Sequence, residues 1–107
     1  VIARAAQDRV EEAYFQRARV DIYRRWALPA FQSGDWAEGI RRTTYQATPG
    51  NIHQELINNV RYGYDRWIAQ LIASGRRLEA RRIARRAMAD PFLAGQIDGA
   101  FAPSPGK

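Results

Sequence analysis

The sequence matches itself when it is shifted by 41 positions, and this self-similarity limits the possible folds more than any single motif. The shift brings two tyrosines, two tryptophans and two Ser-Gly pairs into register. The aligned pairs are Tyr23 with Tyr64, Arg25 with Arg66, Trp26 with Trp67, Ser33 with Ser74, Gly34 with Gly75, Glu38 with Glu79 and Arg41 with Arg82. The pattern predicts two copies of one unit, in which an aromatic helix, a Ser-Gly turn and a second helix follow one another.

Apolar residues recur with helical spacing along nearly the whole chain, and no alternating run of β-branched residues predicts a strand. In the first segment they occupy every fourth position, which indicates one long amphipathic helix: Ala6, Val10, Tyr14, Ala18, Ile22, Trp26 and Ala30. A broader apolar face follows in the second half: Ile52, Leu56, Val60, Tyr64, Trp67 and Leu71. We therefore expect an all-α protein.

Turn and capping residues divide these segments into antiparallel helical hairpins. Each Ser-Gly pair ends a helix, because glycine readily takes the left-handed conformation. Asp35 with Glu38 starts the second helix as in a capping box, and Thr48 or Asn51 caps the third. We expect one domain over residues 1–102 with about five helices: a hairpin at about 2–47, a hairpin at about 52–89, and a capping helix at about 91–101, before a flexible tail at 103–107.

The second helix of each predicted hairpin begins with a related motif. Gly-Asp-Trp-Ala-Glu-Gly-Ile at 34–40 and Gly-Arg-Arg-Leu-Glu-Ala at 75–80 resemble the start of the second helix of a tetratricopeptide-type repeat. Ala84, Ala87 and Pro91 are similar to the small residues and terminating proline of that family. The first copy departs from it at Gly39, Thr43 and Gln46, and the offset of 41 exceeds the family's repeat of about 34 residues. The resemblance implies stacked hairpins whose first helices line a groove for a partner peptide, without enzymatic activity.

Arginine supplies nearly all of the positive charge in a chain of net charge +6. The excess is concentrated at residues 75–89, which hold six arginines and one glutamate. Arg81, Arg82, Arg85 and Arg86 fall on the side of this helix opposite its apolar residues. Three interpretations stay open: an anion site for nucleic acid, a site for an acidic protein, and a solvated face whose arginines pair with acids on adjacent helices. An anionic membrane surface is a weaker fourth.

The polar face of the helix predicted after residue 51 is a second candidate site. In a tetratricopeptide-like array this face would line the groove. Its amide, phenol and charged groups suit a peptide backbone and carboxylates, so the candidate partner-binding residues are Asn58, Tyr62, Asp65 and Arg66. Simple solvent exposure explains the same pattern. We expect Trp26 and Trp67 in the core, and Trp36 either there or at an interface.

Catalytic chemistry has little support in the sequence. The only histidine, His53, lies on the apolar side of its helix and suits a core or helix-start role. The absence of cysteine excludes disulfides, thiolate zinc sites and cysteine nucleophiles, and no phosphate-binding loop is present. We expect no enzymatic activity, no cofactor and no metal. No apolar stretch long enough for a membrane span and no signal-peptide pattern occurs, so a soluble chain is expected.

The expected function is a non-catalytic protein–protein interaction or scaffold module. Two hairpins leave an apolar face uncovered, because stacked hairpins bury their apolar surfaces only against neighbours. That face is covered by the long first helix, by the segment from Phe92 to Phe101, or by another chain. On the last of these interpretations we expect a protein partner or homo-oligomer within a larger assembly. The alternative is a nucleic-acid-binding helical module that uses the arginines of residues 75–89.

Overall fold

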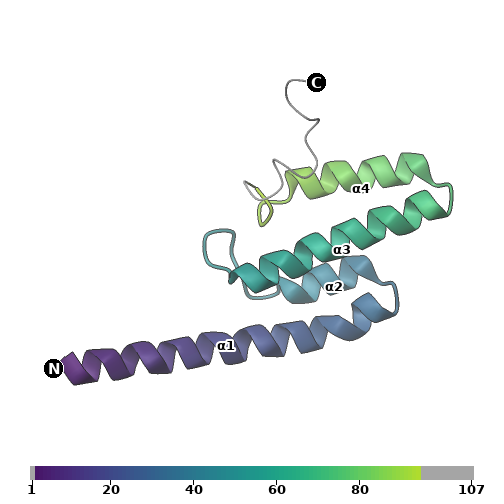
Figure 1. Ribbon diagram of the computed structural model, residues 1–107. Coiled ribbons are helices and arrows are strands. Elements are labelled where there is room, and N and C mark those ends of the chain that lie inside the picture. The colour runs from purple at the N-terminus through teal and green to yellow at the C-terminus, as the bar shows by residue number, and fades with distance from the viewer. Residues whose placement is uncertain (1, 95–107) are drawn as a thin grey trace.

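The computed structural model describes residues 2–94, with side chains from residue 6 onward. Four helices follow one another: α1 (Ile2–Gln32), α2 (Trp36–Thr43), α3 (Gln54–Ala73) and α4 (Arg77–Ala89). Residues 2–94 contain no β-strand, so the all-α class is confirmed. Consecutive helices run in opposite directions, with α1 and α4 on the two outer sides and α2 and α3 between them (Figure 1). The capping helix expected at 91–101 falls largely outside the described residues; its first four residues, 91–94, form a turn.

The turns from α1 to α2 and from α3 to α4 are built alike. Gly34 and Gly75 have φ angles of 81° and 76°, in the left-handed region that favours glycine. Both Ser-Gly pairs therefore end helices as the sequence predicts. Their backbone hydrogen bonds correspond at the same offset of 41 residues: Ser33 to Pro29 and Ser74 to Gln70, Gly34 to Phe31 and Gly75 to Ile72, Asp35 to Ala30 and Arg76 to Leu71.

The start of α2 follows only half of the expected capping box. The Asp35 carboxylate accepts a hydrogen bond from the Glu38 backbone N–H, as an N-cap does. The Glu38 carboxylate does not return the bond, because it binds the guanidinium groups of Arg41 and Arg42 at 2.6 and 2.8 Å. Hydrogen bonds from Arg41 and then Arg42 lower the pKa of Glu38 to about 2.

The start of α3 differs from the sequence prediction, which placed the cap at Thr48 or Asn51. Those two residues close a turn, in which the Asn51 backbone N–H donates to the Thr48 carbonyl at 2.9 Å. The N-cap is His53, whose Nδ1 accepts a hydrogen bond from the Glu55 backbone N–H at 3.1 Å. His53 therefore has the helix-start role that was one of its two expected roles.

The core lies where α2 and α3 meet the second half of α1 and the end of α4. Tyr64 is nearly fully buried there, and its hydroxyl donates to the Asp90 carboxylate at 2.8 Å. Burial, followed by this hydrogen bond, raises the pKa of Tyr64 to about 12. The buried cluster consists of Ala27, Phe31, Ile40, Val60, Tyr64, Ala87 and Leu93, with Trp36, Ile57, Trp67 and Ile83 packed against it.

The regularly spaced apolar stripe of α1 is buried only at its end, at Ala30. Val10, Tyr14 and Ile22 of the stripe are exposed, and the other buried residues of α1, Val20, Ala27 and Phe31, lie outside it. A residue every fourth position advances 40° around the helix at each step, so the stripe winds around α1 and meets the other helices only at its last turn. Trp26 belongs to this stripe and is 38% exposed, which corrects its placement in the core. Its ring packs on Tyr45 and beneath the guanidinium of Arg42.

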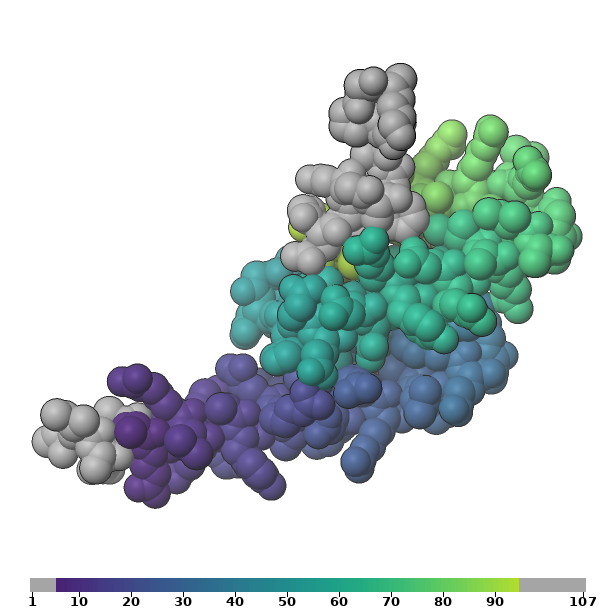
Figure 2. Space-filling model, in the orientation of Figure 1, coloured from purple at the N-terminus to yellow at the C-terminus, as the bar shows by residue number. Residues whose placement is uncertain are grey.

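The molecule is flat and elongated, with extents of 60 × 38 × 17 Å. The first half of α1 projects beyond the other helices as an isolated rod (Figures 1 and 2). Residues 6–17 of this rod are all exposed. Only its last residues reach the other helices, where Arg17 pairs with Glu55 of α3 and Gln16 lines a hollow beside His53, so α1 offers a free surface of somewhat less than half its length.

Gly63→Ala tests the contact that holds α3 against α1 and α2. A Cβ at this position would lie 2.8 Å from the Phe31 ring and 2.9 Å from Ile40. Overpacking of this kind costs about 1–3 kcal/mol, which exceeds the gain of at most about 1 kcal/mol from replacing glycine in a helix. We expect a lower unfolding midpoint in urea, followed by circular dichroism.

The matched control is Gly50→Ala, since nothing lies within 4 Å of the added Cβ there. This control should leave the midpoint nearly unchanged. Equal stability of the two variants would show that Gly63 is not needed for close packing.

Candidate functional site

The first helices of the two pairs, α1 and α3, lie side by side and leave a groove between them. The α1–α3 groove has a volume of about 380 Å³. Both helices present polar and apolar side chains to it, so it offers hydrogen-bonding groups and an apolar floor. The lining residues are Asp21, Arg24, Arg25, Leu28, Phe31, Gln32, Asn59 and Tyr62.

Tyr62 is the most prominent apolar group of the groove. Its ring packs edge-on against Phe31 at 5.9 Å between ring centroids and against Trp36 at 6.5 Å. The residue nevertheless stays 50% exposed, beside the exposed side chain of Leu28. Tyr62 therefore combines a fixed orientation with a large surface open to a ligand.

The charges along the groove are unequally satisfied. Glu55, at the start of α3, forms ion pairs with Arg17 at 2.6 Å and Arg24 at 3.5 Å. The hydrogen bond from Arg17 is the main cause that lowers the pKa of Glu55. Asp21 is paired with Arg17 as well. Arg25 is exposed and has no acid within 4 Å among the described residues, so it is the free cation of the groove.

The structure separates the four candidate partner-binding residues. Tyr62 lines the groove, and Arg66 follows one helical turn later on the same face of α3. Asn58 lies outside the groove and accepts a hydrogen bond from Gln54 at 2.9 Å. Asp65 also lies outside the groove, and its carboxylate forms an ion pair with the Arg61 guanidinium at 4.0 Å. The groove thus uses only part of the face that the sequence indicated.

Sequence analysis missed the α1 side of the groove. Arg25, Leu28 and Gln32 line it, whereas the sequence pattern indicated only the polar face of the later helix. The signal for the α1 side is the offset of 41 residues, which aligns Arg25 with Arg66.

The arginine stripe of α4 has two kinds of members. Arg81, Arg82 and Arg85 are exposed and have no ion pair among the described residues. The guanidinium of Arg86 instead lies over the Trp67 ring at 5.4 Å. The only acid of α4, Glu79, is bound by Arg76 at 2.6 Å. The arginines of the stripe are therefore not neutralised by acids of adjacent helices within residues 6–94.

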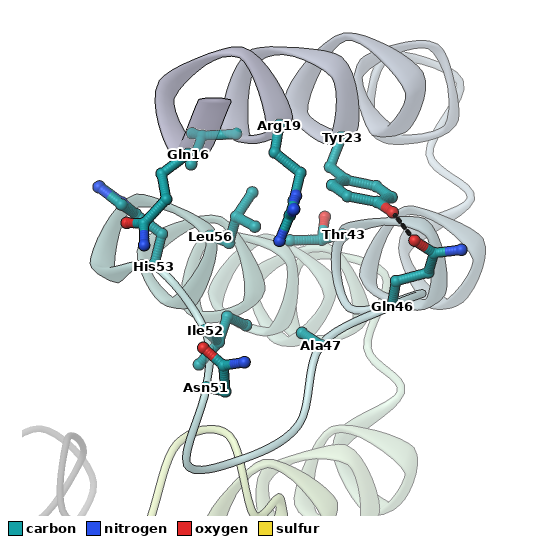
Figure 3. A pocket seen from close by; sticks show the side chains of 11 residues that line it. Gln16, Arg19, Tyr23, Thr43, Gln46, Ala47, Asn51, Ile52, His53 and Leu56 are labelled. Atoms are coloured by element: carbon teal, nitrogen blue, oxygen red, sulfur yellow. Dashed lines mark hydrogen bonds between the residues drawn. The ribbon is translucent and has the colours of Figure 1, made fainter. Parts of the chain in front are cut away.

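A smaller hollow of about 150 Å³ lies where α1 passes the end of α2 and the start of α3 (Figure 3). The side chain of Arg19 reaches into it from α1, and no carboxylate lines it. The hydroxyl of Tyr23 closes one side by donating to Gln46 at 2.8 Å. The hollow is smaller than the roughly 300–1,000 Å³ of usual ligand pockets.

The described residues show no metal site or membrane-spanning helix. No group of three or more His, Cys, Asp and Glu side chains that could hold a metal occurs among them. No helix in this part of the chain has both the length and the apolar character that a membrane crossing requires. Their buried polar side-chain atoms all have hydrogen-bond partners, so none of these atoms awaits a ligand.

Glu55 provides a test of the geometry at the groove. Its pKa should lie below the usual 4.5 in the folded protein, because Arg17 stabilises the carboxylate. The resulting stabilisation is present above pH 4.5 and is lost as the pH falls through the lowered value. Titration of the side-chain carboxyl carbon by NMR measures this pKa directly.

The same titration in Arg17→Gln should return the pKa of Glu55 most of the way to its usual value. Arg24→Gln should have a smaller effect, since this pair is longer and contributes less. An unchanged pKa in Arg17→Gln would contradict the ion pair between α1 and α3.

Neither protein-family models nor curated proteins nor solved structures match this chain. The function is therefore inferred from the residues of the chain itself, and the resemblance to tetratricopeptide-type repeats stays a prediction.

Proposed function

We propose that the chain is a non-catalytic protein-interaction module, a scaffold component that binds a peptide segment of a partner protein in the α1–α3 groove. The observation that carries this proposal is the half-exposed Tyr62 ring over a groove of about 380 Å³. Rigidly held aromatic side chains with exposed surface are typical anchors of protein interfaces.

The groove chemistry specifies the kind of segment. Leu28 and Tyr62 provide an apolar contact, and the amides of Gln32 and Asn59 can bond to a peptide backbone. The free guanidinium of Arg25 favours a carboxylate nearby. The ligand is therefore a short segment with an apolar side chain next to an acidic one.

The similarity of the two Ser-Gly turns supports this proposal. Matching backbone hydrogen bonds and positive φ angles at the two turns are consistent with α1 and α3 as the first helices of two related pairs. The resemblance to tetratricopeptide-type repeats implies that such first helices line the groove, and Tyr62 and Leu28 line the groove between α1 and α3.

Selection from a displayed random peptide library tests the groove. Enriched peptides should carry an acidic residue beside an apolar one. Tyr62→Ala should weaken their binding by about tenfold or more, because an interface anchor is lost. Isothermal titration calorimetry with a synthetic selected peptide measures the change.

Tyr14→Ala is the matched control, since Tyr14 is also an exposed helical tyrosine but lies on the free half of α1. It should bind the selected peptides as the unaltered chain does. Peptides that bind Tyr62→Ala with undiminished affinity would rule out the groove as their site.

Nucleic-acid binding through α4 is the second candidate function. Three of its arginines, Arg81, Arg82 and Arg85, are exposed without a neutralising acid among the described residues. Arg86 contributes less, since its guanidinium already packs on Trp67. The specific observation in favour is thus an unneutralised cluster on one helix face.

A salt titration with a labelled oligonucleotide separates the two functions. Three phosphate contacts predict a slope of about −2.7 for log affinity against log salt concentration, which should disappear when Arg81, Arg82 and Arg85 are replaced by glutamine. Replacing Arg9, Arg19 and Arg25 on α1 removes the same charge and should leave most of the slope. Equal effects of the two triple variants would indicate only a general attraction between a basic chain and polyanions.

A further inference from the structure

The outer face of the α3–α4 pair has an uncovered apolar hollow of about 370 Å³. Ile72 on its floor is 52% exposed. The lining residues are Ile68, Ile72, Arg77, Ala80, Arg81 and Ala84. Each lies 41 positions after a residue of the α1–α2 pair, and these counterparts are Ala27, Phe31, Trp36, Gly39, Ile40 and Thr43.

All six counterparts are buried or half-buried, and Gly63 of α3 packs directly on two of them, Phe31 and Ile40. The hollow on the α3–α4 pair therefore corresponds to the surface of the α1–α2 pair on which α3 packs. Within the described chain no helix packs on the hollow.

The helix whose outward face could cover this hollow is α1, which lies on the opposite side of the molecule. In α3 the residues that face the α1–α2 pair include Leu56, Gly63 and Trp67. At the same offset α1 carries the apolar residues Phe15, Ile22 and Trp26, and it has Arg19 at the position of the buried Val60. Phe15 and Ile22 are 58% and 63% exposed, and Trp26 is exposed as well. The outward face of α1 is thus in the register that α3 uses for packing.

We propose that two copies of this chain associate head to tail, with α1 of one copy seated on the α3–α4 face of the other. The contact repeats the packing of α3 on the α1–α2 pair. Because α1 and α4 are the two outer helices (Figure 1), a pair of associated copies still has one free α1 face and one free α3–α4 face. Such a heterologous contact continues from copy to copy and builds an extended assembly or a ring.

The contact between copies is less close than the contact within the chain that it repeats. Within the chain, Gly63 packs so closely on Phe31 and Ile40 that no Cβ fits. Between copies, Ile22 takes the place of Gly63, Ile72 that of Phe31 and Arg81 that of Ile40. Ile22 adds more volume than the replacement of phenylalanine by Ile72 removes, so the two copies lie farther apart than α3 and the α1–α2 pair.

One pair of opposite charges meets at this contact, with Asp21, which Arg17 also binds within the chain, on the α1 side. Within the chain, the Tyr62 ring contacts Trp36 at 6.5 Å between centroids. Their counterparts at the same offset are Asp21 and Arg77, which would face each other between copies as an ion pair. Arg77 is exposed and has no acid within 4 Å among the described residues.

This inference deepens the proposed scaffold function by naming a second copy as one partner. Ile22 and Ile72 do not line the α1–α3 groove. Failure of peptide binding in Tyr62→Ala and failure of self-association are therefore separate results.

Analytical ultracentrifugation of three samples tests the proposal. The unaltered chain should show a mass above 12.2 kDa that rises with concentration between about 1 μM and about 1 mM. Ile22→Glu and Ile72→Glu should each weaken association by about a hundredfold or more, because each buries an unpaired charge in the contact. Both positions are exposed within one chain, so the helical circular dichroism signal should persist.

A mixture of the two variants provides the decisive measurement. Ile22→Glu retains an intact α3–α4 face, and Ile72→Glu retains an intact α1 face. Their equimolar mixture should form a 1:1 dimer of twice 12.2 kDa and nothing larger. A monomeric unaltered chain, as expected if another segment of the chain covers the hollow, would overturn the proposal, and so would a mixture that stays monomeric.

A charge exchange checks the predicted pair. Asp21→Arg and Arg77→Asp should each associate about tenfold more weakly than the unaltered chain. Mixing them restores opposite charges at every contact, so association should recover. Failure to recover would remove Asp21 and Arg77 from the contact and overturn the proposed register.

Discussion

The close packing around Phe31 is the constraint on which the rest of the structure depends. Its ring lies between two helices that each place a glycine against it, Gly39 on α2 and Gly63 on α3. Trp36 and Tyr62 then pack on the same ring from the sides. Because only glycine lets both helices approach this closely, the ring sets how α1, α2 and α3 lie against one another. The position of the α1–α3 groove follows from the same contact.

Helix class and turn positions could be predicted from the sequence because they depend on neighbouring residues. The helical spacing of apolar residues and the two Ser-Gly pairs led to the helices and to the stops at Gly34 and Gly75. Helix caps were harder to predict, because several nearby polar residues could each take the N-cap position. His53 caps α3, whereas Thr48 and Asn51 close a turn. Local signals therefore reveal which segments are helical but not always where they begin.

The candidate site was only partly predictable, because it depends on which face of each helix meets a neighbour. The stripe through Val10, Tyr14 and Ile22 has clear periodicity, yet the helix packs through Val20, Ala27 and Phe31. Periodicity alone cannot distinguish a face that packs within the chain from one that is open to another molecule. Tyr62 was identified from its polar neighbours, whereas the opposite wall of the groove on α1 was not.

The flatness of the molecule has a consequence for its cooperativity. Although the shortest extent is only 17 Å, the helices are not equally covered: α3 packs on α1, α2 and α4, whereas α4 packs mainly on α3. The two outer helices therefore have fewer neighbours to stabilise them than α3 has. Hydrogen exchange in such a layer spreads inward from the two outermost helices, and the amide protons of α2 and α3 are the last to be replaced by deuterium.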